Sequence, residues 1–492
     1  MPINSFLYPG AKFTPSYEVA NSLRFNSASA DSLTRSTSGA GTSNTTFTIS
    51  LWIKKSSNDS AARRLLEFYN NSSYYVSLRF RDDHSNRLDF YSESNGSAVN
   101  LRTTRSFRDP SSWYHIVMRV DTTQSTADDR LRMYVNGVQE TDFAARTNPS
   151  SSENLQFNGS GDNQLISQSG SDTANNRRFN GYMAEVCFID GQSLDPTSFG
   201  EFNEDSPTIW QPKDVSGLTF GNNGFYLDFE DSSSLGNDAA GSNNFTVNNL
   251  TAVDQSTDTC TNNFATMNLL DVTLPSTFAL SEGNLDALLN GFSSSGGYHY
   301  PRAYSTFQLT TGKWYAECKI TEENDSGIIG ISARTAVSLV SVGGTDRDWL
   351  GINAHDYRYY HDGTKMNNNS SSSYGTTWDN GDTIGVALDL DNLAVYFSLN
   401  GTFQASGDPT SGSSRTNAAF NLTAVASTPN GAYKIGIGTQ GDANQTQGVW
   451  NFGSPPYAIS SGNADANGYG NFEYSVPSGY YSICTKNLAE FG

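Results

Sequence analysis

The sequence predicts an all-β protein that folds as two separate antiparallel β-sandwiches. Its composition favours β-strands joined by polar loops, because only 16% of the 492 residues are charged while 12% are aromatic and 44 are glycine. Apolar residues recur at every second position over many short stretches, which is the spacing of half-buried strands. A strand pair that closes on Asn-Gly occurs once in each half, at Asn136-Gly137 and at Asn400-Gly401.

The clearest strand pair lies in the second half of the chain. Apolar residues alternate over 384–390, stop at Asp391-Asn392, and alternate again over 393–399. Period-two alternation, a polar break and a closing Asn-Gly predict two antiparallel strands with a turn after each. The same plan occurs in the first half over 113–121 and 131–137.

Residues 1–20 hold three prolines and little periodicity, so they are predicted to form an extended arm. The first sandwich is assigned to residues 21–205. It ends with a short helix, because Asp195-Pro196 combines an N-cap residue with a first-turn proline. Its other strands are predicted at 22–26, 47–55, 65–69, 74–80, 88–91 and 179–189.

Residues 206–270 are rich in Ser, Asn, Gly and Asp and are predicted to be a connector with one strand at 224–230. The second sandwich is assigned to residues 271–492. It begins with a predicted helical turn at 284–291, which Gly291 stops. Its other strands are predicted at 312–320, 327–332, 357–365 (a hairpin around Asp362-Gly363), 432–438 and 450–453.

Charge and hydropathy exclude several functions. The chain has a formal net charge of −20, so it lacks the basic surface that nucleic-acid binding requires. No apolar run approaches the length of a membrane span, so no membrane insertion is expected. The first ten residues lack the basic and apolar regions of a secretory signal.

The four cysteines are widely spaced and match no Cys-x-x-Cys metal pattern. Cys187 and Cys318 lie within apolar runs predicted as strands, which favours buried free thiols. The thiol or disulfide state of all four cysteines, Cys187, Cys260, Cys318 and Cys484, stays open at this point.

The strands of the first half resemble the laminin G-like, concanavalin A-like lectin family across residues 20–200. The motifs that carry the resemblance are FTISLWIK (47–54), WYHIVMRVD (113–121), LRMYVNG (131–137) and FNGYMAEVCFID (179–190). The family implies a jelly-roll sandwich of two antiparallel sheets, and its members often bind calcium or sugar at one rim. Asp121, Asp128 and Asp129 are the candidate Ca²⁺ ligands, against the alternative that they are solvated loop acids. No other cofactor is expected.

The second half resembles a SPRY domain across residues 295–485. Five motifs occur in the family's order: GKWYAE (312–317), IIGIS (328–332), WDNGDTIGVALDLD (378–391), VYFSLNG (395–401) and WNFG (450–453). The resemblance implies a second jelly-roll-like, bent β-sandwich that presents loops for protein recognition. It brings no catalytic chemistry.

The tandem arrangement resembles virion structural proteins of marine tailed phages. The evidence is the domain pair together with the connector motif TDTCTNNFAT (257–266) and the closing motif YSICTKNL (481–488). The resemblance implies a head- or tail-attached appendage on the particle surface. The opening segment would anchor it to phage head or tail proteins, with Phe6, Leu7 and Tyr8 as candidate anchoring residues.

Catalysis is not predicted. The sequence holds no Gly-x-Ser-x-Gly, no phosphate-binding loop and no His-Glu-x-x-His motif. Asp228 and Glu230 have the spacing of a carboxylate pair on one strand face, but a strand edge facing water explains them better. His355 and His361, with only Asp356 and Asp362 beside them, are too few ligands to predict a metal site.

One aromatic set is a candidate ligand-binding surface, because sugar rings stack on Tyr and Trp and protein interfaces use the same residues. Its members are Trp349, Tyr357, Tyr359, Tyr360, Tyr374 and Trp378. The alternative is that alternate members fill the core, as period two demands.

The sequence therefore predicts a non-enzymatic phage virion protein that presents lectin-like sandwiches to a host-surface glycan or protein. Two alternatives stay open: a carbohydrate-binding receptor-recognition protein that is not a permanent part of the particle, and a polysaccharide depolymerase. A homo-oligomer is expected, although no heptad repeat argues for a particular one.

Overall fold

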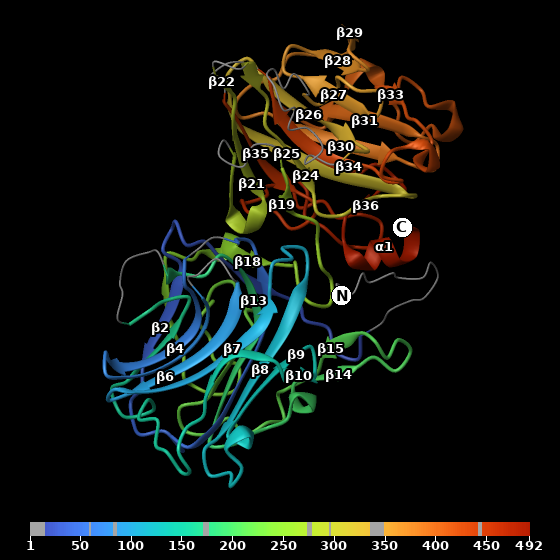
Figure 1. Ribbon diagram of the computed structural model, residues 1–492. Helices are drawn as coiled ribbons and strands as arrows, with labels where there is room; N and C mark the ends of the chain where they lie inside the picture. Colours follow the sequence, from blue (N-terminus) through green and yellow to red (C-terminus); the bar gives the residue numbers. More distant parts are fainter. Residues whose placement is uncertain are drawn as a thin grey trace. The chain divides into compact units, whose positions relative to one another are not determined.

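The computed structural model describes residues 15–58, 61–81, 86–170, 177–272, 278–294, 297–334, 349–440 and 445–492. Within these ranges almost every regular element is a strand (Figure 1). The chain forms two compact units whose boundary in the sequence lies between Thr261 and Asn262. Each unit contains two large antiparallel sheets, so the predicted all-β fold with two sandwiches is confirmed.

The N-terminal sandwich comprises the described residues from 15 to 261. Its first sheet contains, in spatial order, β10 (Val138–Gln139), β9 (Leu131–Val135), β8 (Trp113–Asp121), β3 (Thr46–Lys55), β13 (Gly181–Asp190), β1 (Ser22–Phe25) and β18 (Gln255–Ser256), and β16 (Phe225–Leu227) also pairs with β13. Its second sheet contains β11 (Phe143–Thr147), β7 (Ser97–Ser106), β6 (Arg87–Ser94), β5 (Tyr74–Phe80), β4 (Arg63–Asn71), β12 (Asn163–Ile166), β2 (Ser32–Ser36) and β17 (Thr246–Asn248). A separate short pair is formed by β14 (Gly200–Phe202) and β15 (Trp210–Pro212).

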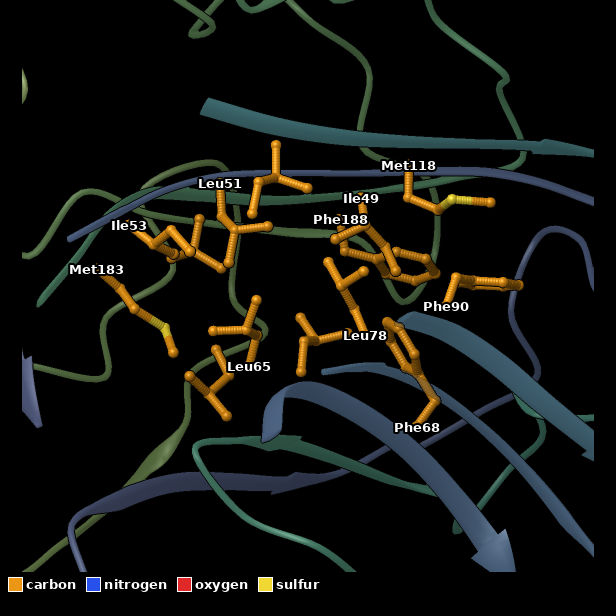
Figure 2. Close-up of a cluster of buried hydrophobic side chains, with 14 of the residues drawn as sticks. Ile49, Leu51, Ile53, Leu65, Phe68, Leu78, Phe90, Met118, Met183 and Phe188 are labelled. Atoms are coloured by element: carbon orange, nitrogen blue, oxygen red, sulfur yellow. The ribbon is translucent and has the colours of Figure 1, made fainter. Parts of the chain in front are cut away.

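The core of the N-terminal sandwich lies between these two sheets. Alternate residues of β3, namely Ile49, Leu51 and Ile53, point into it and are fully buried (Figure 2). They pack with side chains of the facing sheet, such as Phe68 and Leu78. The period-two pattern read from the sequence therefore marks the inward face correctly.

Except at the edge strand β10, the outer face of the first sheet is also buried, which the sequence did not indicate. All ten residues of β13 are buried, and Trp52 of β3 packs with Val19 and Trp113 in a second apolar cluster. The cover comes partly from residues 15–20, because Val19 is buried and the Tyr17 hydroxyl lies 3.2 Å from that of Tyr226. Within the predicted arm of residues 1–20, residues 15–20 therefore dock on the N-terminal sandwich.

The predicted connector of residues 206–270 is wrong for residues up to 261. Strands β16, β17 and β18 from this stretch pair with β13, β2 and β1 of the sandwich. The carboxylate of Asp258 also forms an ion pair with Lys54 at 2.6 Å, and it accepts a hydrogen bond from the Trp113 indole at 3.1 Å. These pairings place the stretch inside the N-terminal unit.

Strand β13 carries a bulge that separates two pairings on one edge. Before the bulge it pairs with β1, and after it with β16, while the register against β3 shifts between Ala184 and Cys187. Glu185 lies in the bulge with a left-handed φ of 52°. The bulge turns its carboxyl into the buried outer face, where the Tyr226 hydroxyl donates a hydrogen bond to it at 2.8 Å.

The C-terminal sandwich comprises the described residues from 262 to 492. Its first sheet contains, in spatial order, β19 (Met267–Val272), β24 (Arg302–Ser305), β34 (Lys434–Thr439), β26 (Gly327–Ser332), β27 (Asp356–Tyr360), β28 (Thr364–Asn367) and β29 (Ser370–Ser373). Its second sheet contains β20 (Phe278–Ser281), β21 (Asp286–Asn290), β35 (Gln445–Asn451), β25 (Lys313–Glu323), β30 (Thr383–Asp389), β31 (Ala394–Leu399) and β32 (Thr402–Phe403), with β33 (Phe420–Asn421) on β31 and β36 (Tyr481–Ser482) parallel to β25. The remaining elements are a short pair, β22 (Phe292–Ser294) and β23 (Gly297–His299), and one helix, α1 (Thr485–Phe491).

The strand pair β30–β31 and the hairpin β27–β28 confirm the two clearest predictions for this half. The helical turn predicted at 284–291 is wrong, because a single 3-10 turn at Glu282–Asn284 is followed by strand β21. Other 3-10 turns within the described residues are Ala127–Asp129, Pro196–Ser198, Ala252–Asp254, Gln404–Ser406, Gly412–Ser414 and Val425–Ser427. The turn at Pro196–Ser198 follows Asp195 as the sequence predicts.

All four cysteines are free thiols, and Cys187, Cys318 and Cys484 are buried. None of the helices in the described ranges has the length and apolar character that a membrane crossing requires.

Burial raises the pKa of Glu185 to about 8, and the nearby carboxylates of Asp228 and Glu230 add to the effect of burial. The folded protein therefore keeps a proton that the unfolded chain releases near the ordinary glutamate pKa of about 4.3. We expect the unfolding free energy of the wild type to fall relative to Glu185→Gln as the pH rises from about 5 to about 8, and the difference to level off above that pH. Calorimetric unfolding of both full-length proteins at several pH values measures this difference. Parallel stability curves would contradict it.

Candidate functional site

A polar cleft of about 380 Å³ lies at one end of the N-terminal sandwich. Its volume falls within the range of about 300–1,000 Å³ that small-molecule sites occupy. Three loop regions form the cleft: the end of the loop before β3, which contributes Asn44, the turn between β4 and β5, and the segment that leads into β12. The lining residues are Asn44, Asn70, Asn71, Tyr74, Asn154, Gln156, Gly159 and Asp162.

Asp162 joins two of the three loop regions. Its carboxylate is buried and accepts hydrogen bonds from the Asn70 amide at 2.5 Å and from the backbone N–H of Gly159 at 2.6 Å. Asn70 in turn accepts a hydrogen bond from the side chain of Asn71, and Asn71 accepts one from the backbone N–H of Ser73 at 2.9 Å. The turn between β4 and β5 is therefore tied to the segment before β12.

Asn44 ties the third loop region to the same segment. Its side-chain oxygen accepts hydrogen bonds from the backbone N–H groups of Phe157 at 3.3 Å and Asn158 at 3.0 Å. These bonds use only the oxygen, so both N–H groups of the Asn44 amide stay available to a ligand. Hydrogen bonds thus hold the walls of the cleft together. In each of the amides of Asn44, Asn70 and Asn71, these bonds leave at least one N–H group unused.

Asn154 and Gln156 also present polar groups to the cleft. Both are exposed, and the Asn154 oxygen accepts a hydrogen bond from the backbone N–H of Gln156 at 2.9 Å. Gln156 has a left-handed φ of 49°. Tyr74, which is half-buried, supplies the aromatic ring of the cleft.

The chemistry of the lining favours a neutral, hydroxyl-rich ligand. The lining residues include no Lys, Arg or His, and the one carboxylate is already engaged by two donors. Side-chain amides both donate and accept hydrogen bonds, as do sugar hydroxyls. A partly exposed tyrosine ring offers the apolar face on which a sugar ring can stack.

The structure does not bring the predicted aromatic set together on one surface. Four of its six members, Tyr357, Tyr359, Tyr374 and Trp378, are buried in the core of the C-terminal sandwich and present no ring to a ligand. Only Trp349 and Tyr360 are partly exposed. They pack beside Tyr304, Ile328 and Leu350 in a small cluster outside that core.

The period-two geometry of β27 explains the division. Tyr357 and Tyr359 point to the core, whereas Arg358 and Tyr360 point to the opposite face. The Arg358 guanidinium lies over the Tyr360 ring, 4.5 Å from the ring centre. The guanidinium therefore covers part of the Tyr360 ring. The candidate surface is thus reduced to Trp349 and one partly covered tyrosine.

The three aspartates predicted as Ca²⁺ ligands each have a partner of their own. Asp121 accepts hydrogen bonds from the Thr123 hydroxyl and the Gln124 amide, both at 2.6 Å. Asp128 pairs with Arg146 at 3.1 Å, and Asp129 pairs with Arg132 at 2.7 Å. Within the described ranges, they are not among the side chains whose metal-ligating atoms converge.

The predicted anchoring residues Phe6, Leu7 and Tyr8 lie outside the described residues. Sequence reasoning missed the amide-lined cleft, although one signal was present. Asparagine recurs in the loops at Asn70-Asn71, between two strands that were correctly predicted, and between 154 and 163. Loops placed on a rigid sheet framework often carry binding residues.

Comparison with protein-family models identifies both domains. Residues 27–195 match the model of the concanavalin A-like lectin/glucanases superfamily, and residues 313–456 match the model of the SPRY domain. These matches confirm the two family resemblances. Comparison with the curated proteins finds no match.

Among solved structures, the chain is similar to the SPRY domain of human HERC1, with 13% identity over 37% of this chain and 96% of that one at a TM-score of 0.27. It is similar to the heptameric SAP-like pentraxin of Limulus polyphemus, with 12% identity over 36% of this chain and 80% of that one, also at 0.27. The third similar structure is stonustoxin, with 17% identity over 38% of this chain and 27% of that one at 0.26.

The role of Asp162 is tested by Asp162→Ala. We expect the change to destabilise the cleft by about 1–3 kcal/mol, because the backbone N–H of Gly159 loses its buried acceptor. Hydrogen–deuterium exchange measures this locally: peptides covering 66–76 and 150–162 should exchange faster in the variant. Peptides from residues 297–334 are the internal control and should be unchanged. Equal exchange in the two proteins at the cleft would show that Asp162 does not hold the loops.

Proposed function

We propose that the chain is a non-enzymatic binding protein that holds a neutral glycan in the amide-lined cleft of its N-terminal sandwich. The observation that carries the proposal is the set of available amides of Asn44, Asn154 and Gln156 around Tyr74, in a lining without basic residues. A sugar presents adjacent hydroxyls that each donate and accept, and such amides satisfy both requirements. The match of residues 27–195 to the lectin-like superfamily supports the same assignment.

In this proposal the protein is a structural appendage on the surface of a phage particle, attached to head or tail proteins through its first residues. This proposal rests on the tandem of a lectin-like and a SPRY domain together with the sequence motifs at 257–266 and 481–488. Both domains face the host, where the ligand is a surface glycan or protein. Many copies on one particle, or a homo-oligomer, turn a weak single-site affinity into firm adhesion.

A receptor-recognition protein that is not a permanent part of the particle would carry the same cleft, so the particle experiment below separates the two. A depolymerase has less support. Glycoside hydrolysis generally needs two carboxyl groups that flank the bond, and the cleft lining supplies one, which is already engaged.

Glycan binding is tested by Gln156→Ala and Tyr74→Ala in the full chain. We expect each change to weaken glycan affinity by about 3- to 10-fold, because a hydrogen bond or a stacked ring contributes roughly 1 kcal/mol. Glycan arrays identify the ligand, and titration calorimetry with that ligand measures the affinity.

The matched control is Gln139→Ala. Gln139 is also an exposed glutamine of the N-terminal sandwich, but it lies on the edge strand β10, outside the cleft lining. Its substitution should leave the affinity unchanged. If the wild type binds no neutral glycan, or if all three variants bind equally well, the cleft is not a sugar site.

The virion assignment is tested by electron microscopy of intact particles labelled with an antibody to the C-terminal sandwich. We expect label on the particle surface, and its position distinguishes head from tail. A variant that lacks residues 1–14 should fold but fail to join the particle. This deletion leaves Tyr17 and Val19, which pack on the sandwich, in place. Unlabelled particles, with the epitope accessible in the free protein, would refute a permanent place in the virion.

A further inference from the structure

Three metal-ligating side chains converge at one end of the C-terminal sandwich. Glu323 is the last residue of β25, Asp325 lies in the turn to β26, and His361 directly follows β27. One ligand atom from each lies within 4.8 Å of the others. They form a mixed set of two carboxylates and one imidazole. This cluster is independent of the amide-lined cleft, which belongs to the other sandwich.

Glu323 is held in a fixed orientation. Its side chain is buried, and its Oε1 accepts hydrogen bonds from the backbone N–H groups of Ser326 and, at 2.7 Å, of Gly327. The other oxygen, Oε2, accepts a hydrogen bond from the backbone N–H of Asp325 at 3.1 Å and also faces His361. The turn therefore aims one carboxylate oxygen at the histidine with little freedom to move.

The distance between Glu323 and His361 fits a shared cation better than a direct bond. His361 Nδ1 lies 3.6 Å from Glu323 Oε2, which is longer than an N–H···O hydrogen bond. Two ligands of a tetrahedral zinc ion, each about 2.1 Å from the metal, lie about 3.4 Å apart. The two atoms are thus separated by nearly the distance that a common zinc ion would require.

His361 and Asp325 are also positioned by their surroundings. The backbone N–H of His361 donates to the carbonyl of Gly327 at 3.0 Å, and its carbonyl accepts from the N–H of Trp378 at 2.9 Å. Its ring packs edge-to-face on Tyr360, with the ring centres 4.4 Å apart. The Tyr360 hydroxyl donates to the carbonyl of Asp325 at 3.1 Å, which fixes the turn.

We propose that Glu323, Asp325 and His361 bind a divalent transition-metal ion, Zn²⁺, with water at the remaining position. An imidazole ligand favours zinc over calcium or magnesium, which prefer oxygen ligands alone. The two carboxylates neutralise the charge of the ion. Asp325 is exposed, so that side of the site is open to solvent. Bound metal would fasten the turn between β25 and β26 to the end of β27.

The proposal is tested by titrating untagged full-length protein with zinc chloride near pH 7.5 and measuring bound metal by mass spectrometry. We expect one Zn²⁺ per chain and a higher unfolding temperature in its presence. His361→Gln and Asp325→Asn should weaken zinc binding by at least about 10-fold, since even indirect metal partners contribute that much. Asp325 is an exposed turn residue, so Asp325→Asn tests the site without risk to the core.

The matched controls are His355→Gln, which lies before β27 at its opposite end, and Asp362→Asn, which follows His361 directly; both change the same residue types outside the converging set. Both should bind zinc like the wild type. The proposal is overturned if the wild type takes up no zinc at saturating metal. The proximity of Glu323 and His361 would then be a contact between side chains without a bound metal. It is equally overturned if the site variants bind zinc as tightly as the controls.

Discussion

The organisation of the N-terminal sandwich depends on one constraint: its first sheet is buried on both faces except at the exposed edge strand β10. When a sheet is covered on both sides, every polar group that the cover removes from water needs a hydrogen-bond or ion-pair partner. Strand β13 supplies Glu185, which receives a hydrogen bond from Tyr226. Strand β3 supplies Lys54, which pairs with Asp258. Both partners come from the stretch after residue 205, so the sheet and its cover form one folding unit.

This constraint also explains which parts of the fold the sequence could predict. Strands such as β3, β8 and β30 follow from local alternation, because each has one face on the core between the sheets. The cover does not alternate, and apart from the strand predicted at 224–230 its two- and three-residue strands leave no local signal above that of a polar loop. Residues 15–20 and 206–261 therefore looked like an arm and a connector. Their place becomes visible only through pairings with strands far away in the sequence.

The candidate binding residues were harder to predict than the strands, for two different physical reasons. In β27, alternation shows that Tyr359 and Tyr360 face opposite ways, but not which of them faces the core. In the cleft, Asn44 and Asn154 are more than 100 residues apart and meet only because β3 and β12 belong to facing sheets. Neither residue lies in a motif. The composition of the loops indicated polar chemistry but could not say which loops share a site.

The order in which strands pair has a consequence for how the protein folds during synthesis. Strand β1 pairs with β13 and β18, and β2 pairs with β12 and β17, so the earliest strands join some of the latest ones of the unit. Contacts of such long sequence separation form slowly, since a large loop must close before they stabilise anything. Until residue 256 has left the ribosome, the N-terminal unit lacks its last strand and exposes unpaired edges. We therefore expect the yield of native protein to respond more to translation rate and chaperone supply than to small changes in final stability.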